Sequence, residues 1–249
     1  MPVGKPYPLC ARNEAFPMPH QYDERLIRHH VRIYENLKDE VLDLFKYIEP
    51  NTSNFSTYSI KIHSLLVRIC IEVEGLFKSI FIANGFEFSK KIKGDILLYS
   101  RIEKSHRLSD YAVSLSALGS HVFSPFESFK EPILDSRSPS WYKAYNATKH
   151  DSYSNFSQAN LENLLSALSG LFTVHLSISG KGFDEHVSYM KNIVEVMSIG
   201  DPNLKIDSIK FYTKSDFEVL KVPFWSESEK YSFDWSLIID QTHYQKLQF

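Results

Sequence analysis

Two long amphipathic segments separated by a short turn constrain the fold of this chain more than any other feature. They extend over residues 23–49 and residues 57–84. In each segment apolar residues recur every three or four positions, which is the period of one face of an α-helix. Pro50 and the polar run at 51–54 end the first segment. The pattern therefore predicts an antiparallel pair of helices, with Gly85 as the C-terminal cap of the second.

The rest of the chain predicts more helix and a few short strands. We expect a short helix at 95–103, strands at 111–115 and 121–123, a helix from 139 to about 151, an apolar helix from about 157 to 176, a helix at 184–197, and a β-hairpin of strands 207–213 and 216–222. Ser138 and Ser157 are the expected N-caps of the two central helices. The turn Ser124-Pro125-Phe126 is expected to fix an aromatic ring.

These elements predict a mainly α-helical fold. Its expected form is an antiparallel four-helix bundle with minor β elements and a C-terminal β-hairpin. A Pro-rich arm at 1–22 precedes the bundle domain at 23–198. The hairpin and an aromatic tail at 199–249 are expected to pack on the bundle.

Composition narrows the range of functions. The net charge of −2 gives no global attraction to nucleic acid, so such a contact needs a local basic patch. The only two cysteines, Cys10 and Cys70, make neither a disulfide framework nor a metal site, and they favour a cytoplasmic compartment. From the five prolines and the missing apolar run in residues 1–20 we expect no signal peptide, and no stretch reaches the length of an uncharged membrane span. We expect no cofactor and no metal, because phosphate loops and histidine pairs at zinc spacing are missing.

The segment from Trp141 to Asp151 combines aromatic, basic and amide side chains directly before the most regular apolar helix. In a helix Asn146, Lys149 and His150 lie three and four residues apart, so they share one face. Such a trio can hold a phosphate, transfer a proton, or hydrogen-bond the bundle together. The function predicted for the chain depends on which of these it does.

The second helix offers the charged partners for that segment. Its pairs Arg68 with Glu72, and Glu74 with Lys78, are four residues apart and have the spacing of surface ion pairs. Glu72, however, lies among apolar residues in helical projection, and a partly buried carboxylate needs a partner. The helix that carries Lys149 and His150 is the expected source of that partner.

The same segment resembles the nuclease motif of the HEPN superfamily, small helical domains of prokaryotic toxin–antitoxin and phage-defence proteins and of RNA-processing enzymes. That motif is an Arg, often followed by Asn, with a His four to six positions after the Arg and a Tyr close behind. Asn146 and His150 match it, and Tyr153 stands one position later than expected. Tyr145 stands in the Arg position. The resemblance covers about residues 53–179.

The resemblance implies metal-independent RNA cleavage at a site formed across a homodimer, in a bacterial cytoplasmic protein. His150 would be the general acid and base, and Asn146 would orient it or contact the phosphate. Tyr145 would donate a hydrogen bond but brings no positive charge, so Lys149, Lys143 or Arg68 would supply the cation. Further residues expected to support the site are Glu72, Glu74, Trp141 and Tyr153.

Two other functions fit the same residues. In the first, the chain is a non-catalytic helical dimerisation or interaction module, and Asn146, Lys149 and His150 form a structural network with Glu72 or Glu74. This function explains the missing Arg. In the second, the bundle binds a nucleotide or another small molecule, and Trp141, Tyr142 and Tyr145 stack a base.

Overall fold

The computed structural model of this chain describes residues 9–12, 24–89, 92, 94–179, 216–226 and 229. Within them the fold is mainly helical with one small antiparallel sheet, as the sequence predicts. The helices are α1 (Glu24–Leu42), α2 (Ile60–Ala83), α3 (Ile96–Tyr99), α4 (Glu103–His106), α5 (Ser140–His150), α6 (Ser152–Asn155) and α7 (Leu161–Ser179). The predicted domain boundaries, the predicted helix at 184–197 and the predicted strand at 207–213 lie outside the described residues.

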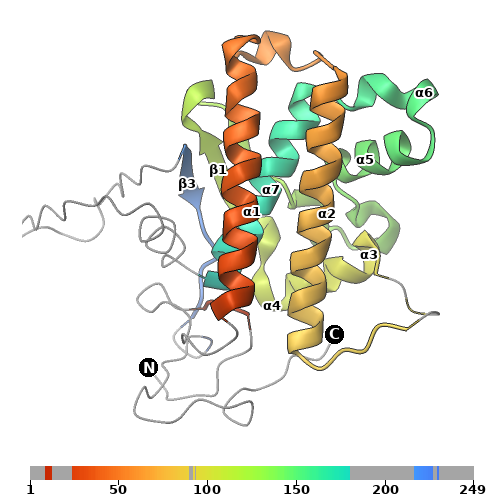
Figure 1. Cartoon of the computed structure of the whole chain (residues 1–249). Coiled ribbons are helices and arrows are strands. Elements are labelled where there is room, and N and C mark those ends of the chain that lie inside the picture. The colour runs from red at the N-terminus through yellow and green to blue at the C-terminus, as the bar shows by residue number, and fades with distance from the viewer. Residues whose placement is uncertain are drawn as a thin grey trace, which may run out of the picture.

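The first two predicted helices form the expected antiparallel pair (Figure 1). A 3-10 turn, Asp43–Lys46, extends α1. Ser59 caps the N-terminus of α2, since its side chain accepts a hydrogen bond from the Ile62 amide at 3.2 Å. Gly85 follows the end of α2 with a φ of +85°, a conformation that glycine adopts without the steric cost of a side chain.

Helix α7 is the central element of the fold. It packs against α1, α2, α5 and strand β1 (Ala112–Leu115), and most of its side chains are buried. Asn160 rather than Ser157 provides its N-cap, because the Asn160 side chain accepts a hydrogen bond from the Asn163 amide at 3.0 Å. Among the described helices, α7 alone has the length and hydropathy of a membrane span. Inside the fold, however, 83% of that stretch is buried, as in the core helix of a globular domain.

A three-stranded sheet covers one side of the helices. Its strand order is β2 (Val122–Phe123), β1 and β3 (Phe217–Lys221), and both pairs are antiparallel. The first two strands confirm the prediction for residues 111–115 and 121–123. Strand β3 confirms a strand within 216–222, and among the described residues its partner is β1. Phe217 of β3 stacks on Phe172 of α7 at 4.9 Å between ring centres, which joins the sheet to the helical core.

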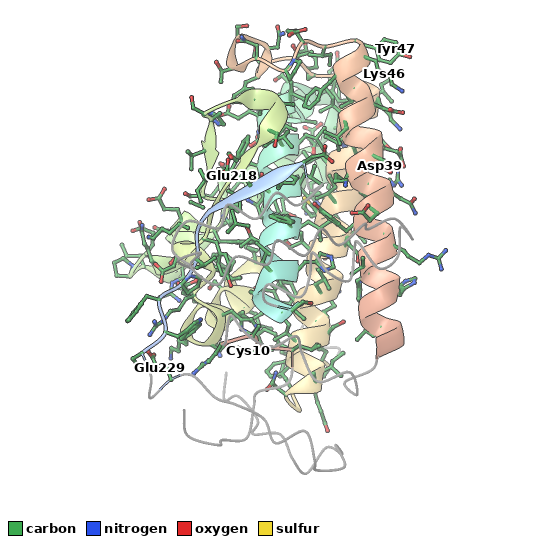
Figure 2. The ribbon with its side chains drawn as sticks, turned by 90° about the vertical axis from the view of Figure 1, so that its left-hand side faces the viewer. Cys10, Asp39, Lys46, Tyr47, Glu218 and Glu229 are labelled. Atoms are coloured by element: carbon green, nitrogen blue, oxygen red, sulfur yellow. The ribbon has the colours of Figure 1, made fainter. Side chains whose placement is uncertain are left out.

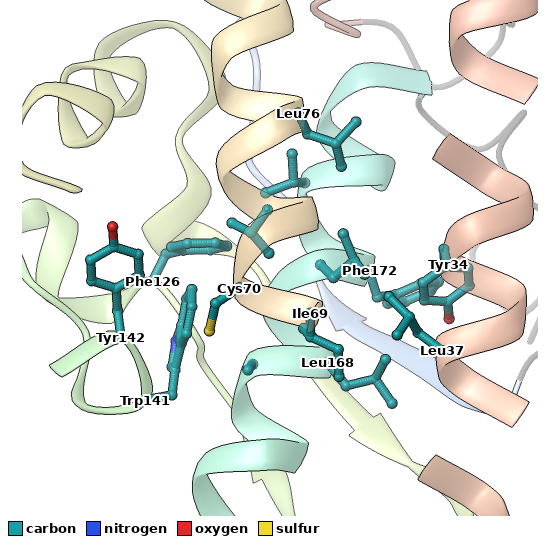
Figure 3. Packing of buried hydrophobic residues seen from close by; sticks show 14 of the residues in the cluster. Tyr34, Leu37, Ile69, Cys70, Leu76, Phe126, Trp141, Tyr142, Leu168 and Phe172 are labelled. Atoms are coloured by element: carbon teal, nitrogen blue, oxygen red, sulfur yellow. The ribbon is translucent and has the colours of Figure 1, made fainter. Parts of the chain in front are cut away.

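The core continues from α1 through α7 to α5. Figure 3 shows Tyr34 and Leu37 of α1 on one side of α7, and Trp141 and Tyr142 of α5 on the other. All four side chains are at most 4% exposed. Helix α5 therefore joins the fold as a core element, through the same segment that the sequence singles out for function.

Candidate functional site

Helix α5 turns its aromatic side chains inward. Trp141, Ala144, Tyr145 and Thr148 occupy one face at helical spacing, and all are buried. The helix begins at Ser140, and the extended Pro139 occupies its N-cap position. No side chain caps this end of the helix, so the prediction that Ser138 is the N-cap is wrong. Its end at His150 agrees with the prediction.

Trp141 is fixed by a hydrogen bond from its indole nitrogen and by the packing of its ring. Its indole Nε1–H donates a hydrogen bond to the Pro125 carbonyl at 2.9 Å, and its ring meets Phe126 edge to face. Gly170 of α7 lies directly against it, where an added Cβ would come within 3.2 Å of the indole. The turn at 124–126 thus fixes an aromatic contact as expected. Trp141 and Tyr145 are each 1% exposed, and Tyr142 is 4% exposed, which leaves no open ring face for a stacked base.

A polar cluster links α5 to α2. The Tyr142 hydroxyl donates a hydrogen bond to Glu74 Oε1 at 2.6 Å. Tyr145 lies one turn after Tyr142 on α5. Its hydroxyl accepts a hydrogen bond from Lys149 Nζ at 3.0 Å, and Nζ lies 4.9 Å from the centre of the Tyr145 ring. Burial, together with the nearby carboxylate of Glu74, raises the pKa of Tyr142 well above its ordinary value. The hydrogen bond from Lys149 to Tyr145 raises the pKa of the lysine.

The two tyrosines of the cluster keep one protonation state over the physiological range. Burial also raises the pKa of Tyr145, so both phenols stay neutral. Burial and the negative charge of Glu74 raise the pKa of the neighbouring Cys70 thiol as well. Glu74, Tyr142, Tyr145 and Lys149 thus form a set of fixed hydrogen bonds, whose chemistry is that of a structural network.

Glu72 finds its partner on a different helix from the expected one. Its carboxylate pairs with Nδ1 of His30 on α1, and both residues are 8% exposed. Arg68 donates to Glu40 of α1 at 2.7 Å instead of pairing with Glu72 along its own helix. The prediction that α5 supplies the partner of Glu72 is therefore wrong. It is Glu74, two residues later, that reaches α5.

Asn146 and His150 lie apart from this cluster. Asn146 is half-buried and His150 is exposed, on the outer face of α5 together with the exposed Lys143. Within the described part of the chain, neither Asn146 nor His150 makes a side-chain hydrogen bond or ion pair. Tyr153 is 97% exposed at the start of α6. The predicted site residues thus divide into a hydrogen-bonded group around Glu74 that includes the exposed Lys149, an exposed group around His150, and the residues Glu72 and Arg68, which pair with α1.

The sequence did not indicate Tyr142 as the partner of Glu74. A signal was present, since a tyrosine three residues before Tyr145 shares its side of α5, but nothing in the sequence specifies which carboxylate faces it. Among the described residues, no group of three or more His, Cys, Asp or Glu side chains is placed to hold a metal ion.

Comparison of the sequence with protein-family models and with curated proteins, and of the fold with solved structures, finds no match. The proposed function therefore rests on the geometry of the chain itself.

Proposed function

We propose that this chain is a HEPN-like four-helix module, built from α1, α2, α5 and α7, that pairs with a second copy of itself and does not cut RNA. Two independent features support the proposal. The first is the position of the motif residues on α5 and the contacts that they make. The second is the outer face of α2.

The motif residues argue against catalysis. In this superfamily an Arg stabilises the charge of the phosphate, and here Tyr145 occupies that position with its ring in the core. The nearby cation Lys149 is tethered to the Tyr145 hydroxyl, and Arg68 is paired with Glu40 beside α1. His150 lies exposed on the outer face of α5. An imidazole without a cation fixed beside it can exchange protons, but no partner then stabilises the negative charge of the five-coordinate phosphorus in the transition state.

The main support for the dimer is a stripe of residues along the outer face of α2. We call the following residues the α2 stripe: Ile60, Ser64, Val67, Ile71, Gly75, Lys78 and Ile82. Their spacing of four and three residues keeps them in line along the helix. Ile60, Ile71 and Ile82 are 79%, 56% and 61% exposed. A row of large apolar side chains in water marks a surface for a partner.

The order of the α2 stripe fits a second copy of α2 running antiparallel. If Ile71 meets Ile71 of the second copy on a two-fold axis, Ile60 meets Ile82 and the branched Val67 meets the small Gly75. Lys78 then meets Ser64, so no like charges oppose one another. In this register each residue meets a residue of the second copy that meets it in return, which is what a symmetric pair requires.

The size of the α2 stripe sets the expected strength of the pair. From Ile60 to Ile82 it extends over 22 residue steps, or about 33 Å. Burying the exposed parts of six isoleucines yields about 6 to 12 kcal/mol, against an association cost of about 4 to 15 kcal/mol. We therefore expect a weak, concentration-dependent dimer, with flanking residues of α1 and α5 adding contacts.

Cross-linking tests the register directly. Ile71→Cys should link to itself across the two-fold axis with a short bis-maleimide, whereas Ile60→Cys should not, since its two copies would lie about 33 Å apart along the helices. The double variant Ile60→Cys with Ile82→Cys should link. Ile71→Arg should abolish the dimer seen by light scattering. A wild-type chain that stays monomeric at all concentrations, or equal linking of the two single variants, contradicts the proposal.

RNA binding or cleavage on the outer face of α5 is the second candidate function. Lys143, Asn146 and His150 lie at helical spacing on that face, and His150 is exposed. Because α1 and α5 flank α2 on opposite sides, the proposed two-fold axis would bring the two α5 outer faces to one side of the dimer. A composite site is then available for an extended RNA.

Incubation with structured RNA in the presence of a metal chelator tests this candidate. Cleavage by the wild type that is lost in His150→Ala and kept in Tyr47→Ala, a variant of an exposed tyrosine beyond α1, would favour the nuclease. Equal absence of cleavage in all three proteins removes it and leaves the dimer proposal intact.

A further inference from the structure

Two segments far apart in the sequence meet beside α4 and the end of α7. The first is residues 9–12, which we call the N-terminal segment. The second is residues 222–226 together with Glu229, which we call the C-terminal segment. Figure 2 shows Cys10 and Glu229 at the same end of the molecule. Each segment buries a side chain there, since Cys10 is 2% exposed and Trp225 is 7% exposed.

The N-terminal segment is attached to the helices through backbone carbonyls. The Ala11 amide donates to the Ser177 carbonyl at 2.9 Å. Ser177 lies in the last turn of α7, where helix carbonyls have no partner within the helix. His106 of α4 donates from Nε2 to the Leu9 carbonyl at 2.8 Å. Water can replace each of these partners when the segment lifts away, so its release does not require α4 or α7 to unfold.

Trp225 connects the two segments. The guanidinium group of Arg12 lies over its ring, 4.7 Å from the ring centre, and that of Arg107 lies over the same ring at 4.4 Å. A guanidinium is attracted to the face of an indole, and more strongly when water is excluded. Arg12 belongs to the N-terminal segment, whereas Arg107 ends α4. One ring of the C-terminal segment therefore holds the N-terminal segment against α4.

Arg107 is itself held in a demanding conformation. It caps the end of α4 with a φ of +48°, a region that residues other than glycine rarely adopt. Its guanidinium donates to the Phe224 carbonyl and, at 2.6 Å, to Glu229. Glu229 accepts further bonds from the amide and hydroxyl of Ser226, at 3.0 and 2.8 Å. These contacts fix the chain on both sides of Trp225.

Strand β3, which precedes the C-terminal segment, is attached to the fold without Trp225. At its start the carboxylate of Asp216 lies 3.2 Å from Nζ of Lys38 on α1, a side chain that is 3% exposed. The Asp216 carbonyl also accepts a hydrogen bond from the Ser116 amide at 2.8 Å. Loss of the Trp225 contacts should therefore free the residues after β3 and leave the sheet in place.

We propose that Trp225 closes a releasable clasp, in which the C-terminal segment holds the N-terminal segment over the end of α7. The two segments then open and close together, because each stabilises the docked state of the other. Opening separates Arg12 from Trp225, exposes Leu9 and Cys10, and uncovers the Ser177 carbonyl, while the helices and the sheet stay folded. The clasp is independent of the proposed dimer, since no residue of the α2 stripe takes part in it.

The two cysteines provide a test in the wild-type protein. Cys10 lies within the clasp, whereas Cys70 is fully buried in α2. Clasp opening should therefore let N-ethylmaleimide label Cys10 alone, and global unfolding should let it label both. We expect Cys10 to be labelled faster than Cys70 at low urea, with each rate divided by that of the same cysteine in the unfolded chain. Equal normalised rates at every urea concentration would overturn the proposal.

Variants show whether Trp225 is the closing residue. Trp225→Ala should label Cys10 about tenfold faster, as the loss of two ordinary cation–π contacts predicts, with Cys70 unchanged. Phe224→Ala is the matched control, because this neighbouring side chain is 80% exposed and the variant keeps its carbonyl. It should behave as the wild type. Unchanged labelling of Cys10 in Trp225→Ala, or an equal increase in Phe224→Ala, contradicts the clasp.

Arg107→Gln tests the coupling between the segments. Arg107 lies outside the N-terminal segment, yet its loss should speed the labelling of Cys10 because it helps to hold Trp225. In the Trp225→Ala background the same change should add little, since the shared contact is already gone. A full additional effect in the double variant would mean that Arg107 acts through α4 and not through the ring. If Trp225→Ala fails to fold, the urea series of the wild type and of Arg107→Gln decides the outcome.

Discussion

The Tyr142 hydroxyl of α5 donates a 2.6 Å hydrogen bond to the Glu74 carboxylate of α2. This contact joins two helices whose remaining interface is largely apolar. It also gives Glu74, a half-buried carboxylate, a donor from within the protein. A charged acceptor makes the bond stronger than one between neutral groups.

Tyr142→Phe tests the energetic role of this contact. The variant keeps the ring in the core but removes the only donor atom of the side chain. We expect the free energy of unfolding to fall by about 1 to 3 kcal/mol, since a partly buried charge loses its partner. Chemical denaturation at neutral pH measures the change. Tyr153→Phe, at a residue that is 97% exposed, is the matched control and should leave stability unchanged.

The sequence predicted the elements of this fold better than their contacts. Helical periodicity identified α1, α2 and α7, because a long helix that buries one face must repeat its apolar residues every three or four positions. The short strands β1 and β2 followed from alternation. The N-caps were less predictable. Several polar residues precede α7, and it is the chain's path, not residue type, that makes Asn160 the cap instead of Ser157.

The candidate site was harder to predict for a physical reason. Helical projection identified Glu72 as a carboxylate that needs a partner, and it has one. Projection gives the direction of a side chain but not which neighbouring helix lies there, so it could not distinguish His30 of α1 from the residues of α5. The polar character of the 141–151 segment likewise concealed that its phenol rings are core side chains.

Loss of the pair between Glu72 and His30 should be costly. In Glu72→Ala the buried imidazole of His30 loses its hydrogen-bond partner, and leaving a buried polar group unsatisfied costs about 1 to 3 kcal/mol. Arg68→Ala, on the same helix, breaks an exposed pair with Glu40 and should cost at most about 1 kcal/mol. Thermal melts of the two variants compare them. Equal losses of stability would mean that burial of the His30 pair adds nothing.

Gly170→Ala tests the close approach of α7 to α5. Alanine favours a helix over glycine by about 1 kcal/mol, but its Cβ would lie 3.2 Å from the Trp141 ring and 3.4 Å from Phe126. Overpacking of a dense core costs about 1 to 3 kcal/mol, so we expect net destabilisation. Ser169→Ala, one residue earlier, is the control. Among the described residues its hydroxyl bonds only the Leu165 carbonyl of its own helix, at 2.8 Å, and its loss should be nearly neutral. A Gly170→Ala variant that melts above the wild type would show that the two rings have room to move.

His175 should make the fold sensitive to acid. It lies on α7 with its ring 5.5 Å from that of Tyr34, and burial, aided by the charge of His30, lowers its pKa to about 3. In the unfolded chain a histidine titrates near pH 6.5. Between these values the unfolded state binds the proton and the folded state does not, so stability is complete above about pH 6.5 and falls as the pH decreases. At about 1.4 kcal/mol per pH unit, the loss reaches roughly 3 kcal/mol near pH 4.5.

His175→Leu removes this titration, and denaturation curves at several pH values should show a flatter pH dependence for the variant, whatever its stability at neutral pH. Parallel pH profiles for the two proteins would mean that His175 is protonated within the fold.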